Sequence, residues 1–180
     1  GAVVGEAIVS DQPSDMEAVL ARIETSKATL VFLAMGGADA GILLRALHAK
    51  GQTPQIITFA MSEKDLSPLA AAAEGLLAVS TYCSDVTSPV AAAFNANYAR
   101  RYGRATSPDA FCEASYCAVR FFALSLENTG SAESDPIAEA LCGLSLCGPQ
   151  GQVALDPESN AASLWPRALR WGAGRGFEII

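Results

Sequence analysis

The chain has 180 residues, of which 51% are hydrophobic and 17% charged, and its formal net charge is −7. This composition provides enough apolar side chains for a sizeable core, which excludes a largely disordered chain. Proteins that bind nucleic acid need a basic face to neutralise phosphates, so the acidic balance argues against direct nucleic acid binding. No apolar run reaches the roughly 18 residues that would suggest a membrane span.

The first half of the chain alternates apolar runs with segments of helical periodicity. We expect strands at residues 2–9, 29–35, 54–60 and 75–82, with helices between them. The run at 29–35, TLVFLAM, is apolar enough for a strand buried on both faces. The helix expected at 63–73 has an early interruption at Pro68. Such βα repeats with short loops predict an α/β fold with a doubly wound parallel sheet.

The rhythm changes after residue 83. Three helices are expected in succession, at 88–102, 109–128 and 135–143, and short strands follow at 152–155, 166–171 and 176–180. The buried candidates of the second helix are Phe111, Tyr116, Val119, Phe122 and Leu126. Because no strands separate these helices, we expect them to cover a different sheet, one whose strands this chain mostly lacks.

The glycine pair at the end of the second expected strand raises the possibility of a nucleotide site. A dinucleotide fingerprint requires G-x-G-x-x-G, but Ala38 stands where the middle glycine belongs. Asp39 is a candidate N-cap of the next helix, and its carboxylate would repel a pyrophosphate there. A NAD-dependent oxidoreductase is therefore only the alternative interpretation.

Catalytic and metal signals are weak. The chain has no G-x-S-x-G elbow and no C-x-x-C pair, and His48 is its single histidine. An odd count of five cysteines does not indicate a disulfide framework. Cys142 and Cys147 could approach each other across a turn, but we interpret them as small buried hydrophobic residues. We therefore expect no enzyme activity, no cofactor and no metal site.

In doubly wound sheets, ligands bind outside the carboxyl ends of the strands. Those ends are predicted at Met35-Gly36-Gly37, at Ala60-Met61-Ser62-Glu63 and at Tyr82. They offer backbone amides, a hydroxyl, a helix N-terminus and an aromatic ring with a polar tip. This lining favours a small, uncharged, polar molecule over a phosphate or a metal.

Motifs along essentially the whole chain resemble a known family. They are GEAIVSDQPSDMEAVLARI, LVFLAMGGADAGILLRAL, SEKDL, AEGLLAVSTYCSDVTSPV, EASYCAVRFFALSLENTGS and ALCGLSLCGPQGQVALDPESN. In this order and spacing they resemble the type I periplasmic-binding-protein superfamily, and most of all its amide- and urea-binding branch. That branch includes a cytoplasmic amide sensor and the solute-binding subunits of ABC transporters for urea and short-chain amides.

The resemblance implies a protein of two α/β lobes that close over a ligand. Residues 1–85 would be a partial second lobe, 86–148 helices belonging to the first lobe, and 149–180 a crossover strand with a C-terminal hairpin. The chain would then be the second half of a longer protein.

The resemblance also implies a set of ligand contacts in a cleft between the lobes. They are Met35, Gly36, Gly37, Ala60, Met61, Ser62, Tyr82, Glu113 and Tyr116. The Ala60-Met61 pair stands where relatives often have hydroxyl residues, which makes the pocket less polar. The solute would be a small amide, urea or amino acid.

Two roles and two locations stay open. The partner would be an ABC transporter permease if the protein serves transport, which would place it in the periplasm. It would be a regulatory protein if the chain belongs to a cytoplasmic ligand sensor.

Overall fold

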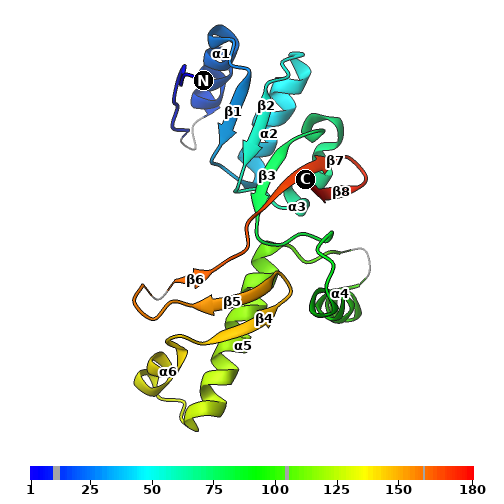
Figure 1. Ribbon diagram of the computed structural model, residues 1–180. Coiled ribbons are helices and arrows are strands. Elements are labelled where there is room, and N and C mark those ends of the chain that lie inside the picture. The colour runs from blue at the N-terminus through cyan, green and yellow to red at the C-terminus, as the bar shows by residue number, and fades with distance from the viewer. Residues whose placement is uncertain (10–12, 104–105, 160) are drawn as a thin grey trace. The chain divides into compact units, whose positions relative to one another are not determined.

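The computed structural model describes residues 1–9, 13–103, 106–159 and 161–180 (Figure 1). These residues form two compact units. The first unit comprises residues 1–79 with 168–178 and 180, and the second unit comprises residues 80–167 with 179. The division into lobe segments at residues 85 and 148 refers to a whole protein, and it stays a prediction.

The first unit contains a five-stranded sheet with the strand order β1-β2-β3-β7-β8. Its elements are α1 (Pro13–Ser26), β1 (Leu30–Leu33), α2 (Gly37–Ala49), β2 (Gln55–Thr58), α3 (Glu63–Leu66), the 3-10 helix η1 (Ser67–Ala73), β3 (Leu77–Ser80), β7 (Arg167–Gly172) and β8 (Gly176–Ile179). Strand β2 pairs in parallel with β1 on one side and with β3 on the other. The predicted α/β fold with parallel strands is confirmed.

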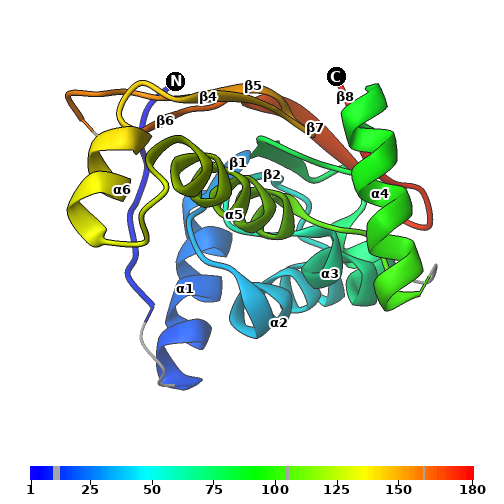
Figure 2. The ribbon, with the colours of Figure 1, turned by 90° about the horizontal axis from the view of Figure 1, so that it is seen from below.

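The helices of this unit cover one face of β1 and β2, as Figure 2 shows. Leu33 of β1 and Leu43, Leu44 and Leu47 of α2 are buried in this layer. Alternate residues of a strand point to opposite faces, and Phe32 of β1 is 61% exposed. The prediction that this strand is buried on both faces is therefore wrong, because the described residues cover only one face.

The helix expected at 63–73 is divided near the predicted interruption. The α-helical turn α3 ends at Leu66, and η1 continues from Ser67 with Pro68 in its first turn and a kink at Ala70. Proline has no N–H group to donate to the preceding turn, which favours a break at this point.

Residues 2–9 do not form the expected strand. They adopt no regular structure, and Val3 and Ile8 are each more than 90% exposed. A strand forms only when its backbone groups find a neighbouring strand, and no described strand pairs with this segment.

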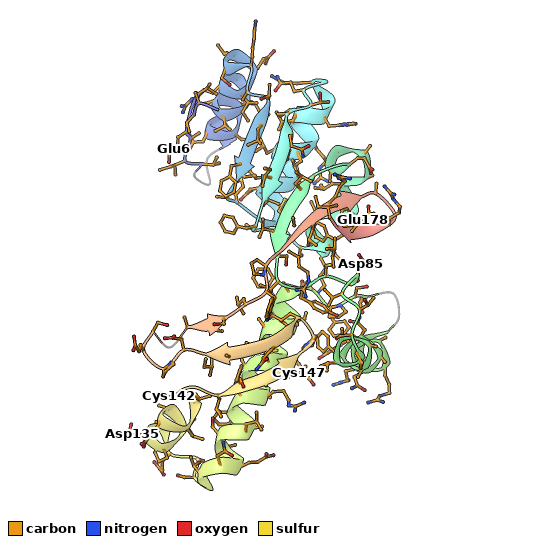
Figure 3. All side chains as sticks on the ribbon, in the orientation of Figure 1. Glu6, Asp85, Asp135, Cys142, Cys147 and Glu178 are labelled. Carbon is orange, nitrogen blue, oxygen red and sulfur yellow. The ribbon has the colours of Figure 1, made fainter. Side chains whose placement is uncertain are left out.

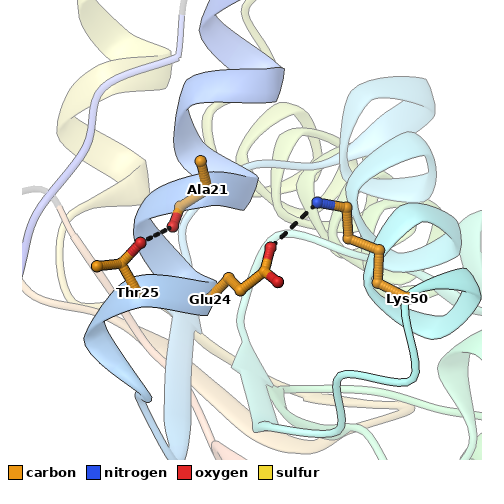
Figure 4. A network of polar contacts seen from close by, with 4 residues as sticks. All are labelled: Ala21, Glu24, Thr25 and Lys50. Carbon is orange, nitrogen blue, oxygen red and sulfur yellow. Dashed lines mark hydrogen bonds and ion pairs between the residues drawn. The ribbon is translucent and has the colours of Figure 1, made fainter.

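A surface ion pair joins the ends of the first two helices (Figure 4). The Lys50 ammonium group lies 3.2 Å from the Glu24 carboxylate, and both side chains are about half exposed. In the same turn of α1, the Thr25 hydroxyl donates to the carbonyl of Ala21. An exposed pair of this kind contributes about 0–1 kcal/mol, so apolar packing carries the contact between these helices.

The second unit has three helices and a three-stranded antiparallel sheet. Its elements are α4 (Pro89–Tyr102), α5 (Ala110–Thr129), α6 (Ser134–Leu141), β4 (Ser145–Gly148), β5 (Gly151–Leu155) and β6 (Ala162–Ser163), and the strand order is β4-β5-β6. The three predicted helices are confirmed to within two residues. Strands β4 and β6 were not predicted, because β4 reads as part of a loop and β6 has only two residues.

Helix α5 packs on this sheet with a different side from the one predicted. Cys117 and Phe121 are buried with Val153 of β5. In contrast, Phe111 and Val119 are each 68% exposed, so their predicted burial is wrong. Helix α5 carries apolar residues on two sides, and among the described residues only one side finds a covering sheet.

Candidate functional site

Two of the predicted binding loops meet at the carboxyl ends of β1 and β2. The first loop holds Met35 and Gly36, and the second holds Ala60 and Met61. A Cβ atom placed on Gly36 would collide with the carbonyl oxygen of Ala60. The loops therefore approach each other backbone to backbone, and only glycine allows this contact at position 36. Their adjacency follows from the parallel pairing of β1 with β2.

Helix α2 begins directly at the first loop. Gly36 is the N-cap residue, with φ −129° and ψ −174°, and Gly37 opens the helix with φ +64°. Asp39 lies inside the first turn, so its predicted role as N-cap is wrong. A carboxylate there still interacts favourably with the positive end of the helix.

Polar residues within the second loop fix its shape. The Thr58 hydroxyl, on a side chain with no exposed surface, accepts a hydrogen bond of 3.1 Å from the backbone N–H of Ala60. The N–H and the hydroxyl of Ser62 both donate to one oxygen of Asp65, at 2.8 and 2.9 Å. Sequence reasoning missed Thr58, whereas the S-x-x-D spacing of Ser62 and Asp65 is a sequence signal of such a cap.

Met61 is buried, whereas Met35, Gly36, Ala60 and Ser62 are half-buried and Gly37 is exposed. Three acidic side chains border these loops, Asp39 in the first turn of α2 and Glu63 and Asp65 in α3. The loop residues 35–37 and 60–62 themselves present mainly backbone groups, the thioether of Met35 and the hydroxyl of Ser62. Such a surface can bind a small molecule through hydrogen bonds and apolar contact, without a fixed positive charge.

In the second unit, Tyr82 and Tyr116 both pack against Phe94 of α4. The ring of Phe94 is 5.7 Å from that of Tyr82 and 5.0 Å from that of Tyr116, measured between centroids. The Tyr82 hydroxyl donates to Asn95 at 2.6 Å, and the Tyr116 hydroxyl accepts from Arg120 at 3.2 Å. Tyr82 is 2% exposed and Tyr116 is half-buried.

Glu113, the third predicted residue of this unit, has no exposed surface. Its oxygen Oε2 accepts from Gln150 Nε2 at 2.8 Å. Its oxygen Oε1 accepts from the Cys117 thiol at 3.0 Å and, more weakly, from the backbone N–H of Gln150 at 3.4 Å. A ligand that contacted this carboxylate would have to displace Gln150 or Cys117.

The same carboxylate affects the chemistry of Cys117. Burial and the hydrogen bond to Glu113 raise the pKa of the Cys117 thiol from 9.0 to about 12. The thiol is therefore protonated at neutral pH, which lets it act as a hydrogen-bond donor and makes it a poor nucleophile.

An open hollow of about 500 Å³ lies at the start of α4. It is lined by residues 84 and 86–89 together with Ala92 and Asn95. None of the nine predicted contacts lines it. Asn95 lines the hollow and also accepts the hydrogen bond from Tyr82, so sequence reasoning placed the tyrosine but missed its partner.

Cys142 and Cys147 are both exposed, in contrast to their predicted burial, and Figure 3 shows them on separate elements. Cys147 lies on β4, and Cys142 directly follows α6. Within the described ranges, no three histidine, cysteine, aspartate or glutamate residues lie close enough to hold a metal ion. The helices in those ranges include none that is long and apolar enough to span a membrane.

Comparison with known proteins supplies a family. A family model described as "Periplasmic binding protein" matches residues 1–173. No curated protein sequence matches the chain.

Solved structures with the same fold include three transport-related proteins. A solute-binding protein from Rhodopseudomonas palustris in complex with 4-hydroxybenzoate is 20% identical, with a TM-score of 0.86 over 99% of this chain and 50% of its own. An amino acid ABC transporter substrate-binding protein from Pseudomonas fluorescens is 18% identical, with a TM-score of 0.84 over 98% and 50%. A leucine-binding protein from Thermotoga maritima is 21% identical, with a TM-score of 0.76 over 92% and 47%. The chain spans about half the length of these proteins.

Proposed function

Because the chain belongs to the periplasmic binding protein family, we propose that it binds a small solute for delivery to a transporter or for ligand-dependent regulation. The solute is held at the carboxyl ends of β1 and β2. The observation that carries this proposal is the contact between the two loops, in which Gly36 lies against the Ala60 carbonyl.

The solute class follows from the groups that these loops present. Backbone N–H and carbonyl groups, the Ser62 hydroxyl and the Met35 thioether suit a small neutral or zwitterionic molecule. The structural neighbours were solved as proteins for leucine, for amino acids and for 4-hydroxybenzoate. We propose an amino-acid-like or amide-like solute, of which urea is the smallest candidate. An aromatic acid is the competing class.

In the second unit, Tyr82 and Tyr116 are the candidate contacts. Both pack on Phe94, and Tyr116 has a half-buried ring whose hydroxyl is held by Arg120. Glu113, which is fully buried, is the third candidate residue of this unit for a role in solute binding. Residues 1–85 and 86–148 are proposed to belong to different lobes of the whole protein, with 149–180 connecting them.

Binding rather than catalysis accords with the family, and the oxidoreductase alternative finds no support in it. Either an ABC transporter permease or a regulatory protein would read the bound state. Cell fractionation distinguishes them, since a transport component belongs to the periplasm and a sensor to the cytoplasm.

The test is calorimetric titration of the protein that carries this chain with leucine, acetamide, urea, 4-hydroxybenzoate and NAD. We expect saturable heat from at least one of the first four and none from NAD. Silence across the first four would refute the solute class, and saturable binding of NAD would refute the proposal as a whole. Replacing Ser62 with alanine should weaken binding of the responding solute, because the half-buried Ser62 hydroxyl is the side-chain group proposed to hydrogen-bond the solute.

A further inference from the structure

A buried polar network connects helix α5 with the turn between β4 and β5. Gln150, which is 2% exposed, lies in that turn, and its side-chain and backbone N–H groups both donate to Glu113. Gly148 allows the turn to come this close, because a Cβ atom there would lie 2.8 Å from the Cys117 sulfur and 3.2 Å from Glu113 Oε1.

The network continues from Gln150 to the segment before β7. The side-chain oxygen of Gln150 accepts from the backbone N–H of Trp165 at 3.2 Å. Its backbone oxygen accepts from Arg167 Nη2 at 2.7 Å. The Gln150 carboxamide is thus held in one orientation, with its amino group on Glu113 and its oxygen on Trp165.

Arg167 extends the network to a second segment. Its Nη1 donates to the carbonyl of Thr81 at 2.6 Å and to that of Trp165 at 3.0 Å. The chain passes from the first unit to the second between residues 79 and 80, and it returns between residues 167 and 168. Thr81 and Arg167 are therefore the anchors of the two connecting segments within the second unit.

We propose that Glu113 is a positioning residue, which acts through Gln150 and Arg167 to hold both connecting segments against the core of the second unit. A carboxylate is required because both of its oxygens accept hydrogen bonds. The inference rests on the proposed function in one respect, since a solute-binding protein that changes shape must bend near such connections. The contacts themselves are tested without any solute.

The chain provides two reporters for this test in its only two tryptophans. The backbone N–H of Trp165 donates to Gln150, whereas that of Trp171 donates to the Leu76 carbonyl in the first unit, at 2.8 Å. Labelling the full chain with ¹⁵N-tryptophan gives one backbone amide signal from each residue. Their hydrogen exchange rates in the absence of solute report separately on the network and on the first unit.

Three variants separate positioning from general stability. In Glu113→Gln, the new amino group faces an N–H donor of Gln150 whichever carboxylate oxygen it replaces. Gln150 must therefore shift, and its side-chain oxygen leaves Trp165. We expect the Trp165 amide to exchange up to about tenfold faster, with Trp171 unchanged, since the loss of its one hydrogen bond to the neutral Gln150 carboxamide has about this effect. Gln150→Glu should do the same by placing two carboxylates together. The double variant E113Q/Q150E restores a donor on position 113 and two acceptor oxygens on position 150, so it should restore slow exchange.

Glu127→Gln, an exposed change on the same helix, is the matched control and should alter neither amide. The proposal is overturned if Glu113→Gln leaves Trp165 unchanged, if both tryptophan amides accelerate together, or if the double variant fails to restore protection. Should Glu113→Gln not fold, the double variant decides alone. A folded double variant with a protected Trp165 supports the proposal, and any other result overturns it.

Discussion

Replacing Gly36 with alanine tests whether the two binding loops are in backbone contact. The dihedral angles of Gly36 are accessible to any residue, so alanine would be tolerated there if space were free. In that case the loss of unfolded-state entropy would stabilise the protein by about 0.4–1 kcal/mol. The added Cβ atom instead meets the carbonyl oxygen of Ala60. Overpacking of this kind costs about 1–3 kcal/mol, so the net expected loss in the free energy of unfolding is about 1–2 kcal/mol.

The assay is unfolding of the protein that carries this chain in guanidinium chloride, followed by the fluorescence of Trp171, which packs edge-on against Phe177 at 5.2 Å. Within these 180 residues, a Trp165→Phe background leaves Trp171 as the single tryptophan. The midpoint should fall while the slope with denaturant concentration stays constant, because the exposed surface is unchanged. Binding of the responding solute should weaken as well, since the shifted loop carries the proposed contacts.

The matched control is Gly51→Ala, at the opposite end of helix α2. Gly51 has φ +67° and no atom near the position of its missing Cβ. Alanine there costs about 1–2 kcal/mol through backbone strain alone, and it should not affect solute binding. The reasoning would be refuted if Gly36→Ala were more stable than the parent protein and bound solute equally well, because the loops would then not touch.

Three further outcomes are expected in the second unit. At pH 8, iodoacetamide should modify the exposed Cys142 and Cys147. Cys117 should react only in denaturant, because burial raises its pKa to about 12. Peptide mass spectrometry measures the labelling, and modification of Cys117 in the folded protein would contradict the expectation. Since the folded pKa of Cys117 lies above 9.0, its contribution to stability is complete below about pH 9 and is lost as the pH rises towards 12. Replacing the buried Phe121 with alanine should lower the free energy of unfolding by about 3–5 kcal/mol. The same change at its exposed neighbour Phe122 should lower it by no more than about 0.5 kcal/mol. Equal losses would disprove the assigned packing side of α5.

The sequence predicted the positions of helices and strands better than it predicted which strands pair and which side chains are buried. Apolar runs and helical spacing located β1, β2, β3 and all three helices of the second unit, because local periodicity determines them. Residues 2–9 have the same apolar character, but a strand also needs a neighbour, and no local pattern reports one.

Helix α5 shows the same limit for side chains. Periodicity favoured the side with Phe111 and Val119 for burial, yet the buried side carries Glu113. The burial of that carboxylate depends on Gln150, which lies 37 positions along the chain. At the candidate site, the carboxyl ends of the strands predicted which loops come together, because parallel pairing places them at one edge. Which groups there contact a solute stays a prediction.

The strand order has a consequence for synthesis on the ribosome. Strand β7 occupies the place beside β3 in the first unit, and Trp171 and Leu76 pair there through a backbone hydrogen bond. Residues 81–166 are translated between these two strands. During synthesis, one edge of β3 therefore lacks its partner strand while nearly all of the second unit is translated. An open strand edge is a template for unwanted pairing, so chaperone demand should be greatest during this interval and should end when β7 leaves the exit tunnel.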